Sequence, residues 1–290
     1  MTMTHLVVQA PVLADADLSH LQTLVQARRD IDLAPHALRM TDVRDDAETR
    51  IAVKTYCTEA GIDWAFVDPG ARLADWKVLA MDMDSTLISI ECIDEIADMA
   101  GLKAQVSAIT EAAMRGEITD FKDSLRRRVA LLRGLPLDAL QQVYIERLKL
   151  NPGAERLVAT ARDSGVKTLL VSGGFTWFTG RLKERLNLDA AHANTLSVDA
   201  QNRLTGEVDG DILDAQAKAD HLVAFAKQHG ALPSQAIAMG DGANDLTMMG
   251  VAGLSVAYHA KPVVRDQATR SINVCGLDSV LNWFEDTAGN

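Results

Sequence analysis

Two aspartates separated by a single residue follow an apolar run in VLAMDMDSTL, residues 78–87. Carboxylates avoid apolar surroundings unless they are paired or bind a metal. Asp82 and Asp84 therefore have two interpretations. Either they belong to a polar turn that ends a strand, or they lie where a cation can hold them both. Two further strand ends favour the second interpretation.

Two other apolar runs also end in small or acidic residues. LLVSG continues into GFT, with Ser172, and AIAMG continues into DGAND, with Asp241 and Asp245. In an open parallel sheet, ligands bind outside the carboxyl ends of the strands. A DxD pair or an SGG turn alone is common. Three such strand ends in one chain favour a shared site over five unrelated turns.

The chemistry that fits this cluster is phosphoryl transfer. Oxygen ligands without a nearby His or Cys favour a hard cation such as Mg²⁺, which also allows neighbouring carboxylates to stay ionised. One aspartate can then attack phosphorus, and the other can protonate the leaving oxygen and activate water. Thr86, Ser172, backbone N–H groups and a lysine would hold the phosphoryl oxygens. Lys218 is the candidate lysine, although its plain interpretation is a surface residue.

Composition limits the class of protein. The 290 residues are 48% hydrophobic and 24% charged, with a net charge of −11, which is typical of a globular protein in water. Such a charge argues against nucleic acid or an anionic membrane as the main partner. The sequence has three cysteines without a CxxC pair, and it has neither a signal-peptide pattern nor a long apolar run. These features favour a cytoplasmic location. We therefore expect a cytoplasmic protein without nucleic-acid or membrane partners.

Two parts are expected on either side of a turn at Pro69 and Gly70. The later part alternates apolar strands with helices, which predicts a parallel, doubly wound α/β sheet. Helical sequence over residues 91–150 follows its first strand, and residues 194–210 are predicted as a hairpin. The earlier part is predicted as strand, helix, strand, helix and strand, at 5–10, 16–29, 33–43, 45–61 and 63–68.

The motifs resemble a known family. MDMDST, VSGGF, Lys218 and GDGAND match in order the four motifs of the haloacid dehalogenase superfamily of phosphohydrolases. ECIDEIADMAG, FKDSLRRRVALLRGLP, NRLTGEV and MGDGANDLTMM are similar to its phosphoserine phosphatase family, and the likeness extends over about residues 76–285. It implies a Rossmann-like phosphatase domain at 76–290 with a small helical cap at about 91–150. Residues 1–75 resemble an α+β ACT-like domain, with regulation or homodimer formation as its expected role.

The resemblance also implies roles for single residues in Mg²⁺-dependent hydrolysis of O-phospho-L-serine, the last step of serine biosynthesis. Asp82 is the nucleophile, and Asp84 is the general acid and base. Mg²⁺ is held by the Asp82 side chain, the Asp84 backbone carbonyl and Asp241. The other implied roles are Glu91 at the substrate ammonium, Arg128 at its carboxylate, Ser172, Gly173 and Lys218 at the phosphoryl group, and Asn244, Asp245, Phe121 and Met114 in support.

The residue types agree with this division of roles. Arginine presents a planar fork that suits a carboxylate, and glutamate supplies the charge that suits an amine. The basic run around Arg128 also has a plain interpretation as a solvated helix face, which suits Arg126 and Arg127. One spacing departs from the family, because Met114 lies seven residues before Phe121 instead of six.

Three other functions stay open at this point. The first is a different phosphatase or phosphotransferase of the superfamily, whose substrate would leave Glu91 and Arg128 unpaired if it lacked an amino-acid head. The second is a receiver-type switch, which must keep its phosphoryl group, whereas Asp84 would hasten hydrolysis. The third is a relative that binds phosphoserine without turnover, although every chemical position holds a competent residue.

Overall fold

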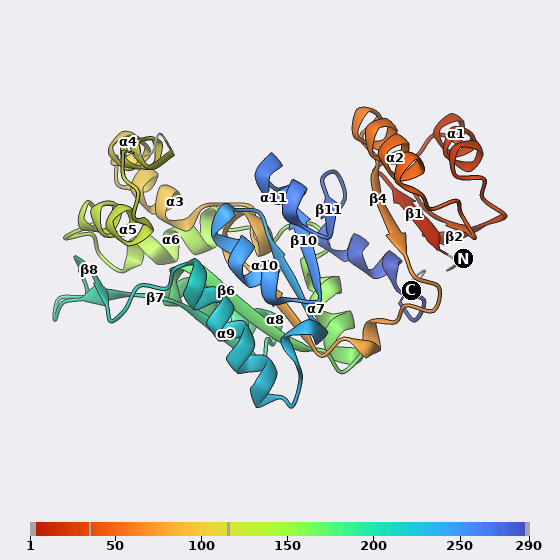
Figure 1. The fold of residues 1–290 in the computed structure, drawn as a ribbon. Helices are drawn as coiled ribbons and strands as arrows, with labels where there is room; N and C mark the ends of the chain where they lie inside the picture. Colours follow the sequence, from red (N-terminus) through yellow and green to blue (C-terminus); the bar gives the residue numbers. More distant parts are fainter. Residues whose placement is uncertain (1–3, 35, 115–116, 288–290) are drawn as a thin grey trace.

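The computed structural model describes residues 4–34, 36–114 and 117–287, and it contains two β-sheets (Figure 1). The smaller sheet has the strand order β2-β3-β1-β4, and the larger has the order β11-β10-β9-β5-β6-β7-β8. No helix in the described part of the chain is both long and apolar enough to cross a membrane. The strands are β1 (His5–Gln9), β2 (Arg29–Ala34), β3 (Ala37–Thr41), β4 (Asp63–Val67), β5 (Val78–Met81), β6 (Lys167–Phe175), β7 (Ala190–Val198), β8 (Leu204–Asp209), β9 (Ala236–Gly240), β10 (Leu254–Tyr258) and β11 (Arg270–Ile272).

The N-terminal part has one strand more than the sequence predicted. Where a single strand was expected at 33–43, β2 and β3 pair as antiparallel neighbours, so that prediction is wrong. The helix α1 (Asp15–Val25) ends early because Gln26 adopts a left-handed conformation, with φ 51°. β2 is an edge strand of sequence RDIDLA, in which three of the six residues are charged and only Leu33 is buried, so it lacks the apolar run of a buried strand. The resulting βαββαβ sheet fits an ACT-like domain.

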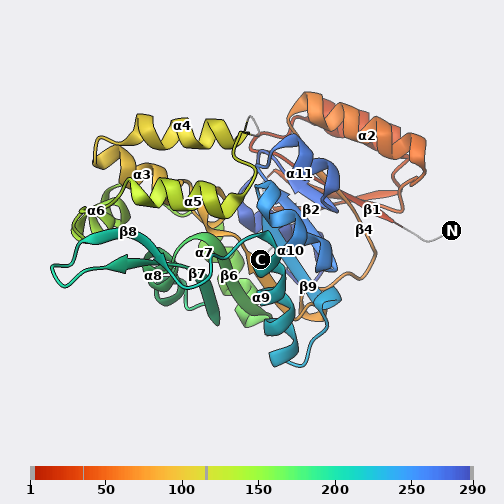
Figure 2. The same cartoon turned by 60° about the vertical axis from the view of Figure 1, so that its left-hand side comes forward.

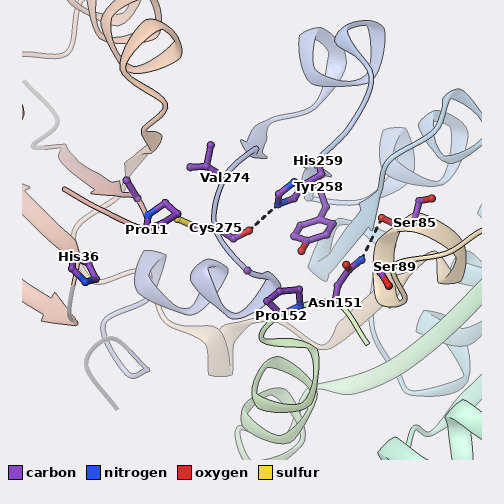
Figure 3. Close-up of a pocket in the computed structure, with 12 residues that line it drawn as sticks. Pro11, His36, Ser85, Ser89, Asn151, Pro152, Tyr258, His259, Val274 and Cys275 are labelled. Carbon is purple, nitrogen blue, oxygen red and sulfur yellow. Dashed lines mark hydrogen bonds between the residues drawn. The ribbon is translucent and has the colours of Figure 1, made fainter. Parts of the chain in front are cut away.

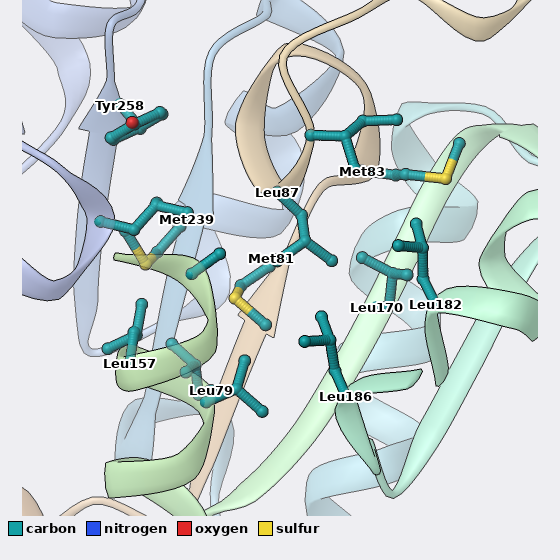
Figure 4. Packing of buried hydrophobic residues seen from close by; sticks show 14 of the residues in the cluster. Leu79, Met81, Met83, Leu87, Leu157, Leu170, Leu182, Leu186, Met239 and Tyr258 are labelled. Carbon is teal, nitrogen blue, oxygen red and sulfur yellow. The ribbon is translucent and has the colours of Figure 1, made fainter. Parts of the chain in front are cut away.

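The larger sheet has helices on both faces. Leu79 and Met81 of β5 belong to one apolar layer, shown in Figure 4, while Val78 and Ala80 belong to the other. All its neighbouring strands are parallel except β7 and β8, which form the predicted hairpin. This arrangement confirms the doubly wound α/β fold. The first layer is covered by α7 (Ala154–Asp163) and α8 (Thr176–Leu186), and the second by α9 (Ala215–Gln228), α10 (Leu246–Val251) and α11 (Pro262–Gln267).

Four helices follow β5 and gather at the end of the molecule away from the N-terminal sheet (Figure 1). They occupy the segment expected to form the cap. The turned view shows α5 beside the β7–β8 hairpin, and α5 contacts β8 (Figure 2). The helices are α3 (Cys92–Met99), α4 (Lys103–Met114), α5 (Phe121–Ala130) and α6 (Asp138–Glu146).

Both faces of the N-terminal sheet are buried. On one face, Leu6 and Val8 of β1 pack in a cluster with residues of α1 and α2 (Ala47–Ala60). On the other face, Val7 belongs to the same apolar cluster as the C-terminal segment η5 (Leu277–Trp283). The N-terminal sheet is therefore held between its own helices and the end of the chain.

A buried carboxylate fixes this junction. Asp63, at the start of β4, is 2% exposed. It accepts backbone N–H groups from Asn273, Val274 and Cys275 at 2.6, 3.1 and 2.9 Å. Hydrogen bonds to a charged acceptor stabilise more than neutral ones, so Asp63 ties the N-terminal sheet to the segment after β11.

We expect Asp63→Ala to lower the free energy of unfolding by about 3 kcal/mol, because three N–H groups at a buried junction lose their acceptor. Urea unfolding followed by tryptophan fluorescence measures the change. Asp32→Ala removes an exposed carboxylate of β2 and is the matched control, with an expected effect below about 0.5 kcal/mol. Equal stabilities of the two variants would show that Asp63 does not hold the junction.

Candidate functional site

Strand register brings the predicted site residues to one level of the larger sheet. Met81, the last residue of β5, is in register with Leu170 of β6 and Met239 of β9. Asp82 follows Met81 directly, and its backbone N–H donates to the Met239 carbonyl at 3.0 Å. The motifs that follow the other two registered positions begin at the same level. Three segments that are distant in sequence therefore meet at one sheet edge, as the strand-end pattern predicted.

Lys218 lies buried among carboxylates. Its Nζ is 2.8 Å from Asp82 Oδ1 and 2.6 Å from Asp245 Oδ1, and the residue is only 1% exposed. Burial alone would lower the pKa of Lys218, but the charges of Asp245 and Asp82 raise it, so the ammonium stays protonated. The plain interpretation of Lys218 as a surface lysine is wrong, because α9 packs on the sheet with this residue on its buried side.

The acidic cluster has the donor set of a cation site. Carboxylate oxygens of Asp82, Asp241 and Asp245 all lie within 4.8 Å of one another. If the three acids are ionised, Lys218 balances one of the three negative charges, and a divalent cation would balance the other two. Burial and the Asp245 charge raise the pKa of Asp241 to about 6, and they also raise the pKa of Asp82. A bound cation favours the ionised forms, and oxygen-only ligands suit a hard divalent metal.

Asp84 is held apart from this cluster by the start of the cap. The Cys92 backbone N–H at the first turn of α3 donates to Asp84 Oδ1 at 3.1 Å. Burial and the charge of Glu91 raise the pKa of Asp84 to about 7, which suits a group that donates a proton and later takes one up near neutral pH. Gly174 passes so close that a Cβ there would lie 2.6 Å from Asp84 Oδ2. The backbone of the SGG turn therefore approaches Asp84 because residue 174 has no side chain.

Asn151 holds the loop that carries Asp84 by hydrogen bonds to its backbone, and this role was not predicted from the sequence. Ser85 in this loop has a left-handed conformation, with φ 55°. Asn151 Nδ2 donates to the carbonyl oxygens of Thr86 and Ile88 at 2.7 and 3.1 Å. Figure 3 shows Asn151 against this loop. Asn151 and Ser85 line a cavity of about 610 Å³ there. The NPG segment indicates a helix start, but nothing in it indicates this contact.

A second asparagine, also missed, fixes the turn after β6. Asn194 is 2% exposed, donates to the Gly173 carbonyl at 2.8 Å and accepts the Leu213 N–H at 2.7 Å. The turn itself is closed by Ser172, whose Oγ accepts the Gly174 N–H at 2.9 Å. Asn194 therefore joins the turn that carries Ser172 to the segment that leads into α9 and Lys218. It lies inside the predicted hairpin, where no motif marks it.

One cavity of about 930 Å³ joins the sheet edge to the cap. The described substrate-facing candidates lie together in its wall except for Lys218, which is buried in contact with Asp82 and Asp245 and does not line the cavity. The side chain of Met114 lies outside the described residues. Lys261 also lines the cavity and was not predicted. The cavity wall includes Asp82, Asp84, Glu91, Phe121, Arg128, Ser172, Gly173, Asp241, Asn244 and Lys261.

Glu91 and Arg128, which are expected to bind the ammonium and carboxylate groups of the substrate, differ in their contacts. Glu91 is exposed and accepts the Ser85 hydroxyl at 2.7 Å. Arg128 is half-buried, and its Nε makes a long contact of 3.5 Å to the Ser124 carbonyl of its own helix. Arg126 and Arg127 are exposed, as the solvated-face interpretation expected. Arg128 is thus the arginine of this run that reaches the cavity.

A doubly wound sheet with an acidic cluster at its strand ends and a helical cap above defines a haloacid dehalogenase-like hydrolase. The family model of that description matches residues 79–250, and the chain belongs to this family. A phosphoserine phosphatase of Polaromonas sp. is 58% identical over 217 residues, which cover 73% of this chain and 92% of that protein.

Two solved structures show the same fold. A HAD family hydrolase from Salmonella enterica serovar Typhi matches with a TM-score of 0.89 and 32% identity, over 99% of both chains. A phosphoserine phosphatase solved as a phospho-aspartyl intermediate analogue matches with a TM-score of 0.67 and 39% identity, over 72% of this chain and 99% of that one. The first likeness includes the N-terminal sheet of this chain.

We expect Asn151→Ala to lower kcat about 10- to 100-fold, because the loop that carries Asp84 loses two hydrogen bonds and small displacements of catalytic groups are costly. Hydrolysis of p-nitrophenyl phosphate measures the change. Gln142→Ala, on the exposed side of α6, is the control with an unchanged rate. A normal kcat in the Asn151 variant would contradict the supporting role.

Proposed function

We propose that this chain is a Mg²⁺-dependent phosphoserine phosphatase that hydrolyses O-phospho-L-serine to L-serine and phosphate, the last step of serine biosynthesis. The observation that carries the proposal is one cavity with Asp82 and Asp84 at the sheet edge and with Glu91 and Arg128 on the cap side. The high identity to a protein of that name supports the choice of substrate.

The substrate's charges match the charges of the cavity wall. The Arg128 guanidinium binds the serine carboxylate through its planar fork. Glu91 binds the ammonium group. The Ser172 hydroxyl, the Gly173 N–H and Lys218 hold the phosphoryl oxygens. Ser172, Gly173 and Asn244 line the cavity, whereas Lys218 is buried in contact with Asp82. Phe121 of α5 closes the cavity beside Gly173, where a Cβ would lie 3.2 Å from its ring.

The reaction proceeds in two displacements at phosphorus. An Asp82 carboxylate oxygen attacks, a P–O bond forms to Asp82, and the P–O bond to the serine oxygen breaks. Asp84 donates its proton to that leaving oxygen. Asp84 then takes a proton from a water molecule, whose oxygen attacks phosphorus and releases phosphate from Asp82. Both aspartates return to their starting forms.

The metal site is proposed at the acidic cluster. Asp82, Asp241 and the backbone carbonyl of Asp84 would hold Mg²⁺, with Asp245 beside them. When bound, the ion supplies positive charge that neutralises the phosphoryl oxygens and keeps these carboxylates ionised. Asp245 also accepts the Gly242 N–H at 3.0 Å and so holds the loop after β9.

For the rest of the chain, we propose a division into residues 1–75, an ACT-like unit, and residues 76–290, the phosphatase with its cap at about 91–150. The four-stranded antiparallel sheet and the Salmonella relative support the first unit. Its proposed role is regulation or homodimer formation. A cytoplasmic location, without nucleic-acid or membrane partners, is proposed from the composition and the free cysteines.

Phosphate release from a substrate panel, with Mg²⁺ and with a chelator, tests the function. We expect O-phospho-L-serine to exceed phosphothreonine, phosphoethanolamine and phosphoglycolate by at least about tenfold in kcat/KM. The chelator should abolish turnover, and Asp82→Asn should abolish it with the fold intact. Equal rates on all substrates would contradict the proposed substrate. Full activity in the Asp82 variant would contradict the covalent mechanism.

We expect Arg128→Ala to remove most of the preference for phosphoserine over phosphoethanolamine, which lacks the carboxylate. A charge-assisted pair of this kind contributes about 1.5–3 kcal/mol, or roughly 10- to 100-fold in kcat/KM. Arg126→Ala removes an exposed arginine of the same helix and should keep the preference. An unchanged ratio in the Arg128 variant would exclude Arg128 as the carboxylate-binding residue.

A further inference from the structure

A half-buried carboxylate in the cap has an oxygen that nothing satisfies. Asp94 lies in the first turn of α3, and its Oδ1 is shielded from solvent with no hydrogen-bond donor among the described residues. An unsatisfied buried charge is costly, so its presence needs an explanation. Oδ1 therefore makes no hydrogen bond that would hold the cap together.

Asp94 lies in the same cavity wall as Arg128, on a different helix. α3 contributes Asp94 and α5 contributes Arg128. Among the described residues, no carboxylate lies within 4.0 Å of the Arg128 guanidinium, whose side-chain contact is the long one to the Ser124 carbonyl. The guanidinium fork is therefore available to an incoming anion.

Two requirements on such an arginine conflict. Its fork must stay unoccupied so that it can bind the substrate carboxylate, yet a partly buried cation without a counter-charge turns towards solvent. A carboxylate in direct contact would meet the second requirement but block the first. A carboxylate in the same wall, beyond contact distance, meets both because its field acts over several ångströms.

We propose that Asp94 is the positioning residue for Arg128, whose guanidinium it holds in the cavity in the orientation that binds the carboxylate of the substrate. This inference rests on the proposed function and adds a second residue to carboxylate recognition. Burial lowers the pKa of Arg128, and Asp94 is the strongest of the charges that oppose this effect. Because Oδ1 of Asp94 is closed off from the cavity, this oxygen acts through Arg128 and not by touching the substrate.

The other acidic residues near Arg128 on α3 and α5 have partners of their own. Glu91 is exposed and accepts the Ser85 hydroxyl, which leaves its charge for the ammonium group. Glu95 pairs with Arg147 at 2.5 Å on another side of α3. Asp123, on α5 itself, pairs with Arg127 at 2.8 Å on the exposed face. Asp84 also lines the cavity, but Asp94 is the charge that acts most strongly on Arg128, and Arg128 acts more strongly on Asp94 than Lys103 does.

The test is the selectivity of Asp94→Asn for substrates that carry a carboxylate. We expect kcat/KM for phosphoserine to fall about three- to tenfold, mainly through KM, while that for phosphoethanolamine stays unchanged. Asp123→Asn removes a carboxylate from the same cap without facing Arg128, and it should leave both values unchanged. Equal losses on both substrates in the Asp94 variant would overturn the proposal.

A double-variant cycle separates positioning from a general effect on the site. In an Arg128→Ala background, Asp94→Asn should cause no further loss on phosphoserine, because the residue it positions is gone. Losses that multiply in the double variant would overturn the proposal. The melting temperature of Asp94→Asn should stay the same or rise, because an unsatisfied buried charge is removed. A lower melting temperature together with uniform losses would assign Asp94 a structural role instead.

A second pair of substrates keeps this test independent of the proposed function. Phosphoglycolate and methyl phosphate also differ by a carboxylate. If phosphoserine is not the preferred substrate but phosphoglycolate exceeds methyl phosphate, the proposed function fails while the Asp94 variant still tests the positioning role. If the wild-type protein shows no carboxylate preference in either pair, the positioning role of Asp94 is overturned as well.

Discussion

The site depends on one ammonium group that is buried among carboxylates. Lys218 is in contact with Asp82 and Asp245, and Asp241 completes the acidic cluster within 4.8 Å. A buried charge is tolerated only where its partners are fixed in place. The ends of β5 and β9 and the face of α9 must therefore be held together accurately, which the tight register of parallel strands provides. The apolar layers on both sheet faces stabilise this register.

The cap supplies a second set of groups that is independent of the first. In the proposed function, the sheet edge carries out phosphoryl transfer, whereas the substrate-binding Glu91 and Arg128 and the proposed positioning residue Asp94 come from α3 and α5 or their ends. This division separates the site from a receiver-type switch, in which an acidic cluster stands without a cap of this size. It also means that substrate choice can change through two helices while the acidic cluster stays the same.

Sequence reasoning found the residues whose signal is local. Asp82, Ser172 and Asp241 follow apolar runs directly, so a strand-end pattern predicts both the fold class and the shared edge. Glu91 and Arg128 came from family resemblance, because a glutamate or a basic helix face alone is ambiguous. Asn151 and Asn194 were missed because their partners are backbone groups distant in sequence. β2 was missed because three of its six residues are charged and the alternation of Ile31 and Leu33 with aspartates is too short to predict a strand.

The position of the N-terminal sheet has a consequence for how the two ends of the chain can change in evolution. Val7 of that sheet shares an apolar cluster with residues of η5, so a chain that began near residue 76 would lose part of the apolar cover of this segment. The phosphoserine phosphatase that matches over 72% of this chain is nearly fully aligned, so shorter relatives exist. Gain or loss of the N-terminal unit therefore changes the surroundings of η5, at the other end of the chain, as well as the N-terminal segment itself.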